Sequence, residues 1–97
     1  TETKPTYSPR NISAMRVSPN PAKEYLNLEV ALSRADNISV NLVDLQGRII
    51  KVFLPMERQY NRRASYTLPL QNVAPGTYVL LLDTSQGGRM AKRVVIE

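Results

Sequence analysis

Carboxylates are the only side chains in this sequence that could carry acid–base catalysis, because its 97 residues include neither cysteine nor histidine. That absence excludes disulfides, thiol nucleophiles, zinc fingers and every catalytic arrangement that depends on histidine. Two carboxylate pairs remain, Asp44 with Glu57 and Glu24 with Glu29. Such a pair acts as general acid and base only in a cleft that excludes water, and the pattern of short strands and tight turns indicates none. We therefore expect no enzymatic activity, no metal site and no cofactor.

The chain is basic. Thirteen Lys and Arg against eight Asp and Glu give a net charge of +5, and nine of the thirteen are Arg. This balance favours anionic partners, namely nucleic acid, lipopolysaccharide or an acidic protein face, while a soluble surface that is simply basic is the alternative. Nucleic-acid binding is not expected, because the aromatic residues form no stacking platform with basic neighbours.

Apolar residues recur with a period of two from residue 14 onward, which is typical of half-buried strands. The residues expected to face inward in two of these strands are Leu26, Leu28, Val30 and Leu32, then Ile38, Val40 and Leu42. Seven strands are expected, at about 13–18, 24–32, 37–44, 48–54, 64–70, 77–83 and 89–96. Short strands at this regular spacing predict an all-β fold, a seven-stranded antiparallel Ig-like β-sandwich.

Turn residues punctuate these strands. "DLQGR" (44–48) suits a tight hairpin with a bulge, with Asp44 as the side-chain cap and Gly47 at positive φ. "APGT" (74–77) predicts a type II turn with Pro75 and Gly76 at its centre, and "SQGGR" (85–89) predicts a glycine hairpin. The sixth strand, apolar on both faces, is expected at the centre of its sheet.

Three segments connect or precede the strands. Residues 1–12 indicate a linker to upstream cargo, ahead of a single domain over residues 13–97. "SPNP" (18–21) predicts a stiff corner, because two prolines fix φ and remove two backbone donors. Residues 55–63 are the longest irregular connection; their three arginines indicate either a solvated loop or a specific anionic contact.

Three motifs in order carry a resemblance. "SPNPAKEYLNLEV", then "VNLVDLQGRIIK", then "APGTYVLLLDTSQGGRMAKRVVIE" at the C-terminus resemble the C-terminal sorting domain of the type IX secretion system, type A. The shared features are a Pro-Asn-Pro opening, an Asp-x-x-Gly-Arg hairpin, a Gly-x-Tyr strand start and a basic-then-apolar end. The resemblance covers residues 16–97. Each motif alone is weak, but their order and terminal placement together are specific.

The resemblance implies a function. Proteins with this domain pass through the periplasm and use the folded domain as the address for export across the outer membrane to the cell surface. The implied partners are the translocon, its shuttle proteins and a gingipain-like sortase, which removes the domain and joins the cargo to anionic lipopolysaccharide. The cut is expected in or just before residues 1–12, where an extended chain is accessible. After cleavage the domain is released.

The resemblance also implies recognition residues by position. They are Pro19, Asn20, Pro21, Asp44, Gly47, Arg48, Gly76, Tyr78, Lys92, Arg93, Val94, Val95, Ile96 and Glu97. Gly47, Pro75 and Gly76 are expected to act through folding, whereas Arg48 and the Lys92–Arg93 pair are expected to be exposed for contact.

The last strand, "KRVVIE", is expected at or near a sheet edge with its end exposed. A partner could then read its side chains and backbone or extend the sheet by strand addition. An exposed edge strand also predicts a homodimer. The alternative is a strand that simply completes the sandwich.

Two other functions stay open. The first is an Ig-like accessory module that binds carbohydrate or an adhesion partner at the cell surface, which a groove of exposed aromatics would favour. The second is an uncleaved sorting domain with a structural or signalling role.

Overall fold

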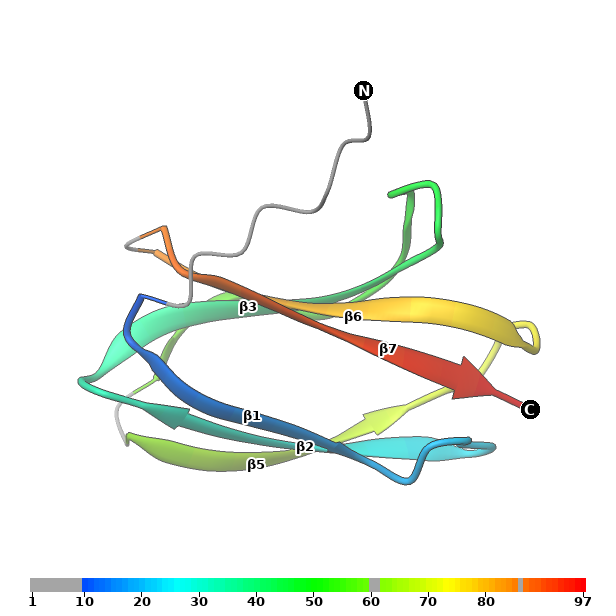
Figure 1. The fold of residues 1–97 in the computed structure, drawn as a ribbon, viewed down its shortest axis with the longest axis horizontal. Helices are drawn as coiled ribbons and strands as arrows, with labels where there is room; N and C mark the ends of the chain where they lie inside the picture. The colour runs from blue at the N-terminus through cyan, green and yellow to red at the C-terminus, as the bar shows by residue number, and fades with distance from the viewer. Residues whose placement is uncertain (1–9, 60–61, 86) are drawn as a thin grey trace.

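The computed structural model describes residues 10–59, 62–85 and 87–97, which form two antiparallel sheets packed face to face (Figure 1). One sheet has the order β1 (Ile12–Ser18), β2 (Tyr25–Leu32) and β5 (Arg63–Pro69). The other has the order β4 (Ile49–Gln59), β3 (Asp36–Val43), β6 (Gly76–Thr84) and β7 (Arg89–Ile96). The expectation of an all-β, seven-stranded sandwich of Ig-like type is confirmed, as is the central place of the sixth strand, β6.

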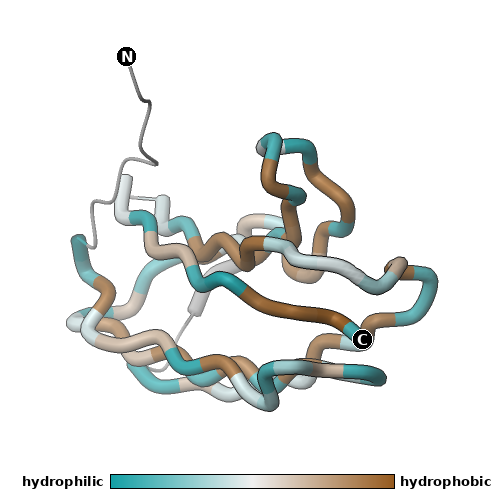
Figure 2. Tube along the Cα trace, turned by 45° about the vertical axis from the view of Figure 1, so that its right-hand side comes forward, coloured by the Kyte–Doolittle hydropathy of each residue, from teal (hydrophilic) through white to brown (hydrophobic). Residues whose placement is uncertain are grey.

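The core lies between the sheets and follows from the period of two. The seven residues expected to face inward in the second and third strands are all buried. Hydrophobic stretches occur in both layers, including the one just before the C-terminus (Figure 2). The largest fully buried side chains are Leu26, Leu28, Ile38, Val40, Leu42, Leu80, Leu82 and Val94. Each contributes roughly 1.5–3 kcal/mol relative to an exposed position, so the two strand faces are the main source of stability.

The expected irregular connection at 55–63 is wrong for residues 55–59, which belong to β4. Val40 pairs with Leu54 and Ile38 with Glu57, so two residues of β4 bulge where β3 has one. Pro55 lies in this bulge. Because β4 is an edge strand, a residue without a backbone donor is tolerated there, and the ladder continues beyond it.

Two turn predictions have different outcomes. The 44–48 hairpin is confirmed: the Gly47 N–H donates to the Asp44 carbonyl at 3.0 Å, and Gly47 has φ 89°. The type II turn at 74–77 is wrong, because Gly76 has φ 159°, near extended backbone, instead of about +80°. The chain turns earlier, where the Val73 N–H donates to the Leu70 carbonyl at 3.2 Å and Asn72 has φ 66°.

The β6–β7 hairpin packs against the start of the domain. The Thr84 N–H donates to the Gly88 carbonyl at 2.8 Å, and the buried Thr84 hydroxyl accepts the Gly88 N–H at 2.8 Å. A Cβ atom on Gly88 would lie 2.2 Å from the Arg10 carbonyl oxygen and 2.7 Å from Thr84 Oγ1. Only glycine fits at this point.

Asp36 anchors the same end of the sandwich and is 8% exposed. It accepts hydrogen bonds from the Ser85 hydroxyl, from Asn11 Nδ2 at 3.2 Å and from the Asn37 N–H at 2.7 Å. Burial acts to raise the pKa of Asp36, but these hydrogen bonds, helped by the charge of Arg34, outweigh it and hold the pKa below its usual value.

No helix long and apolar enough to cross a membrane occurs in the part of the chain described.

Substitutions at Gly88 and Gly47 should distinguish the stability lost through a steric clash from the stability lost through backbone strain. We expect Gly88→Ala to reduce the free energy of unfolding by about 3 kcal/mol, because two backbone segments must move apart. Gly47→Ala is the matched control: its Cβ has open space, so only the positive φ costs stability, about 1 kcal/mol. Urea unfolding at pH 7 measures both. Equal losses would contradict the close approach to Arg10.

Acid should destabilise the fold through Asp36. Its folded pKa lies below the unfolded value of about 3.9, so its contribution is complete above that pH and is lost as the pH falls through the folded pKa. Asp36→Asn should therefore lower stability at pH 7 and give a shallower loss between about pH 4 and pH 2. Unfolding free energies over that range test this; parallel curves for both proteins would show that another group is responsible.

Candidate recognition site at the C-terminal strand

The terminal strand β7 divides its side chains between core and solvent. Val94 and Ile96 face the core with 0% and 3% exposure, while Val95 points outward with 38% exposure. Lys92, Arg93 and Glu97 are exposed, as expected for the two basic residues. The strand forms an edge of the four-stranded sheet, which confirms its expected place.

The Pro-Asn-Pro corner lies along the outer edge of β7. The Asn20 side chain donates from Nδ2 to the Arg93 carbonyl at 3.1 Å and accepts the Val95 N–H at Oδ1 at 2.9 Å. The amide thus makes the two bonds that a neighbouring strand residue would make. Both flanking bonds, Ser18–Pro19 and Asn20–Pro21, are cis.

The backbone after the corner continues this pairing. The Ala22 N–H donates to the Val95 carbonyl at 2.9 Å, and the Glu97 N–H donates to the Ala22 carbonyl at 2.8 Å. Ala22 is 1% exposed and forms a parallel bridge with Ile96. The edge of β7 from residue 93 to 97 is therefore already occupied. The expectation that its backbone is free for strand addition is wrong over this stretch, because two residues of the β1–β2 connection take those hydrogen-bonding groups.

The β1–β2 corner and Glu97 share one shallow hollow of about 350 Å³. Pro19 and Pro21 line it from the corner and Glu97 from the end of the chain. Lys23, Glu24 and Tyr25 complete it, and Tyr25 is 44% exposed. The motif analysis missed these three residues; an apolar ring at an outward-facing position of β2 is the signal that could have found Tyr25.

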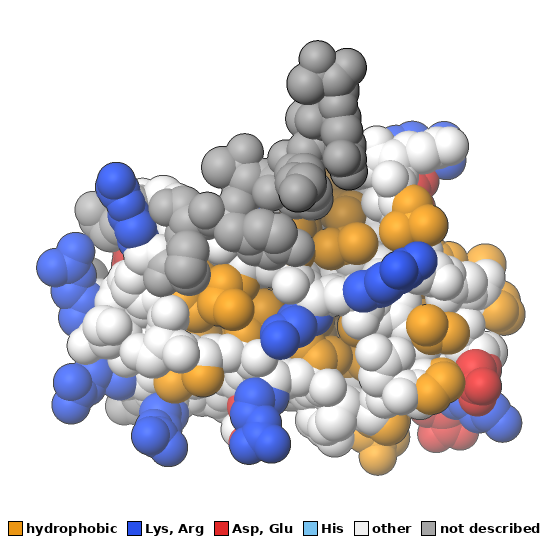
Figure 3. Space-filling model, viewed as in Figure 1, with side chains coloured by type: hydrophobic (Ala, Val, Ile, Leu, Met, Phe, Trp, Pro, Cys, Tyr) orange, Lys and Arg blue, Asp and Glu red, His pale blue; other side chains and the backbone are white. Residues whose placement is uncertain are grey.

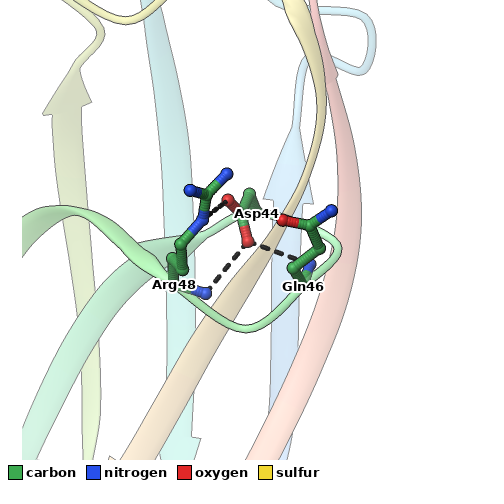
Figure 4. Close-up of polar contacts among 3 residues, drawn as sticks. All are labelled: Asp44, Gln46 and Arg48. Carbon is green, nitrogen blue, oxygen red and sulfur yellow. Dashed lines mark hydrogen bonds and ion pairs between the residues drawn. The ribbon is translucent and has the colours of Figure 1, made fainter.

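The Asp44 carboxylate is used by its own turn (Figure 4). Oδ1 accepts the Gln46 and Arg48 N–H groups, each at 2.9 Å, and Oδ2 accepts Arg48 Nε at 2.8 Å. The Arg48 N–H is the main cause that holds the pKa of Asp44 below its usual value, and the guanidinium adds to it. The Arg48 side chain is 75% exposed, as expected, although it is paired with Asp44.

Gly76 and Tyr78 serve the fold. Tyr78 is 8% exposed, and its hydroxyl donates to the Ala74 carbonyl at 2.6 Å. A Cβ on Gly76 would sit 3.6 Å from the Tyr78 ring, so the ring packs over this residue. The tyrosine fastens the β5–β6 connection to the sheet and presents no surface of its own.

All the motifs lie at one end of the sandwich. Antiparallel pairing within each sheet brings the β3–β4 turn, the start of β6 and the end of β7 together, and Asn20 adds the β1–β2 corner. In Figure 1 this is the end that carries the C-terminus. We call it the motif end. The start of β1 and the β6–β7 hairpin lie at the opposite end.

The described carboxylates and tyrosines lie on different parts of the sandwich. No group of three acidic side chains there could hold a metal ion. Glu29 lies on the outer face of β2 between Arg16 and Ser65, and the side chain of Glu57 lies outside the description. Tyr25 is exposed and Tyr78 buried, so these two do not form a shared groove, and the two tyrosines at 7 and 60 lie outside the described residues.

Comparison with known proteins gives a family and a fold. A family model described as "Secretion system C-terminal sorting domain" matches residues 16–97. A comparison with curated proteins finds no match. Among solved structures, a β-glucosidase from Listeria innocua in complex with glucose is similar, with a TM-score of 0.50 and 18% identity. The similarity covers 86% of this chain but only 16% of that enzyme, so it concerns the fold of one domain alone.

Asn20 should hold the edge of β7 closed. We expect Asn20→Ala to reduce the free energy of unfolding by about 1–3 kcal/mol, since two hydrogen bonds of about 0.5–1.5 kcal/mol each are lost. Hydrogen exchange at the Val95 amide should accelerate, while Asn20→Asp, which keeps the acceptor for that amide, should leave its protection largely intact. Asn27→Ala, on the outer face of β2, is the matched control. Unchanged exchange at Val95 in Asn20→Ala would contradict the pairing.

Proposed function

The chain belongs to the family of secretion system C-terminal sorting domains, and from this premise we propose how it serves as a type IX address. It directs a larger cargo protein through the periplasm and across the outer membrane to the cell surface. The domain has no chemistry of its own in this proposal. The observation that carries it is the gathering of every family motif at one end of a rigid sandwich.

Several finer steps belong to the same proposal. The translocon and its shuttle proteins bind the folded domain, and a gingipain-like sortase then cuts in or just before residues 1–12. The cargo is joined to anionic lipopolysaccharide and the domain is released. Residues 1–9 lie outside the described part of the chain, whereas Arg10 and Asn11 contact Gly88 and Asp36, so a cut before Arg10 would keep these contacts and all seven strands.

The family residues divide into two groups in this proposal. The first group maintains the motif end: Asn20, Asp44, Gly47, Gly76, Tyr78, Val94 and Ile96 are engaged in hydrogen bonds, turns or the core. The second group faces solvent and is read by the machinery: Pro19, Pro21, Arg48, Lys92, Arg93, Val95 and Glu97. Tyr25 joins the second group because it lines the same hollow as three of these residues.

A homodimer through an edge strand stays a prediction. The β7 edge is occupied over 93–97, and the β4 edge is interrupted by register shifts and carries Pro55, features that discourage edge pairing.

A secretion assay tests the sorting function. Residues 1–97 are fused behind a periplasmic reporter in a host with type IX machinery, and surface reporter is measured. Deleting the last four residues would be a poor test, since it removes Val94 and Ile96 from the core. The better variant is Tyr25→Ser with Val95→Ser, both exposed apolar residues at the motif end.

We expect this double variant to lower surface reporter by about tenfold, the change produced by about 1.4 kcal/mol of lost binding. Val52→Ser with Met56→Ser, exposed apolar residues of β4 away from the motif end, is the matched control and should be secreted normally. A wild-type fusion that stays in the periplasm would refute the sorting function. Equal secretion of all three fusions would refute recognition through Tyr25 and Val95 but not the sorting function.

A further inference from the structure

Arginines gather on the sheet β1-β2-β5, toward the end opposite the motif end. Arg16 and Arg63 lie on its outer face, where Arg16 is opposite Glu29 and Arg63 is opposite Ala31. Arg10, Arg34 and Arg62 lie at the adjoining end of the sandwich, where β1 starts and β2 ends. We call these five residues the arginine face. In Figure 3 the Lys and Arg side chains are prominent at the left and lower edge, and the acidic ones at the right.

The five guanidinium groups are exposed and form no ion pair with any described residue. The ion pairs seen among the described residues are made by two other arginines, Arg48 and Arg89. Within the described residues, Arg62 Nη1 donates to the Ser33 carbonyl, at a long 3.5 Å. Glu29 is the one exposed carboxylate described on this face, so the described side chains there carry four net positive charges, against +5 for the whole chain. Asp36 lies behind it and is 8% exposed. Such a concentration of one charge sign attracts an anionic partner.

Two hollows follow the face. One, of about 470 Å³, is bordered by Arg16, Glu29 and Arg63 over a floor of small side chains, including Ala14 and Ala31. The other, of about 360 Å³, is lined by Arg10, Asn11, Ser33 and Arg34. The Ser13 hydroxyl lies 3.2 Å from the hydroxyl of Ser33, which lines the second hollow. Asn11 is occupied within the fold, since its amide accepts the Arg34 N–H and donates to the Arg34 carbonyl and to Asp36. The surface therefore offers guanidinium donors and serine hydroxyls in two separate hollows, more than a single ion requires.

The surroundings distinguish among polyanions. A protein partner would need an apolar centre in its interface, but six of the seven exposed large apolar residues lie on β4, β7 or the 44–48 turn, and the seventh, Tyr25, is at the motif end. Single-stranded nucleic acid would need aromatic side chains for base stacking, and the two hollows are lined by none. A hydrated chain of sugars with acidic groups needs only cations and hydrogen-bonding groups.

We propose that the arginine face binds an acidic polysaccharide, with guanidinium groups on its carboxylates or phosphates and Ser side chains on its hydroxyls. This site is separate from the motif end. The proposal does not rest on the sorting function, since the two surfaces lie at opposite ends of the domain.

Binding of polygalacturonate, phosphomannan and neutral dextran to residues 1–97, measured by calorimetry, tests the site. We expect the Kd for an acidic polysaccharide to rise at least about tenfold between about 50 and about 200 mM NaCl, and no binding of dextran. Polygalacturonate and phosphomannan distinguish carboxylate from phosphate as the charge that is read. Failure of both to bind would overturn the proposal.

Matched variants locate the site. Arg16→Gln, Arg34→Gln and Arg63→Gln together should raise the Kd at least about tenfold, whereas Lys23→Gln, Lys92→Gln and Arg93→Gln, with the same loss of charge, should raise it less than about threefold. An equal rise in Kd for the two triple variants would show that binding depends on net charge alone, and would overturn the location of the site. Tighter binding of duplex DNA or polyglutamate than of either polysaccharide would overturn the ligand class. Circular dichroism confirms that each variant is folded.

Discussion

The closure of the β7 edge is the constraint on which the motif end depends. A sheet edge with free N–H and C=O groups is open to any other strand, and proteins usually protect it. Here the side-chain amide of Asn20 and the backbone of Ala22 form hydrogen bonds with the outward backbone groups of β7 between Arg93 and Glu97. Because this pairing joins residue 20 to residues 93–95, it orders the last residues of the chain, where most domains fray. A terminal segment with one conformation can then be recognised as a folded shape.

The edge closure also explains why the motifs combine folding and contact. The corner residues Pro19 and Pro21 remain exposed while Asn20 between them is engaged. Along β7 the same division follows the pleat, with Val94 inward and Val95 outward. At the corner and along the terminal strand, a residue needed for the fold thus lies next to one that is exposed. Loss of transport on substitution of a motif residue is therefore meaningful only beside a measurement of stability.

The antiparallel topology separates two surfaces with different chemistry. The motif end combines prolines, Tyr25, one valine and charges of both signs. The opposite end and the outer face of the β1-β2-β5 sheet carry exposed arginines and small polar residues. Since successive connections alternate between the two ends, motifs placed at every second connection come together. The two proposed partners would therefore bind at separate surfaces of one folded domain.

The sequence by itself determined the features that depend on near neighbours. The period of two assigned the strands and their inward faces, and Asp44 with Gly47 specified a hairpin whose hydrogen bonds lie within five residues. Pairing between distant segments was decided only by the tertiary structure. Residues 55–59 were expected in an irregular connection, yet pairing with β3 carries β4 on to Gln59. Asn20 reaches a strand 73 residues later, and arginines scattered along the chain meet on one face. Such contacts depend on which edges and ends the fold brings together, and no local pattern records that.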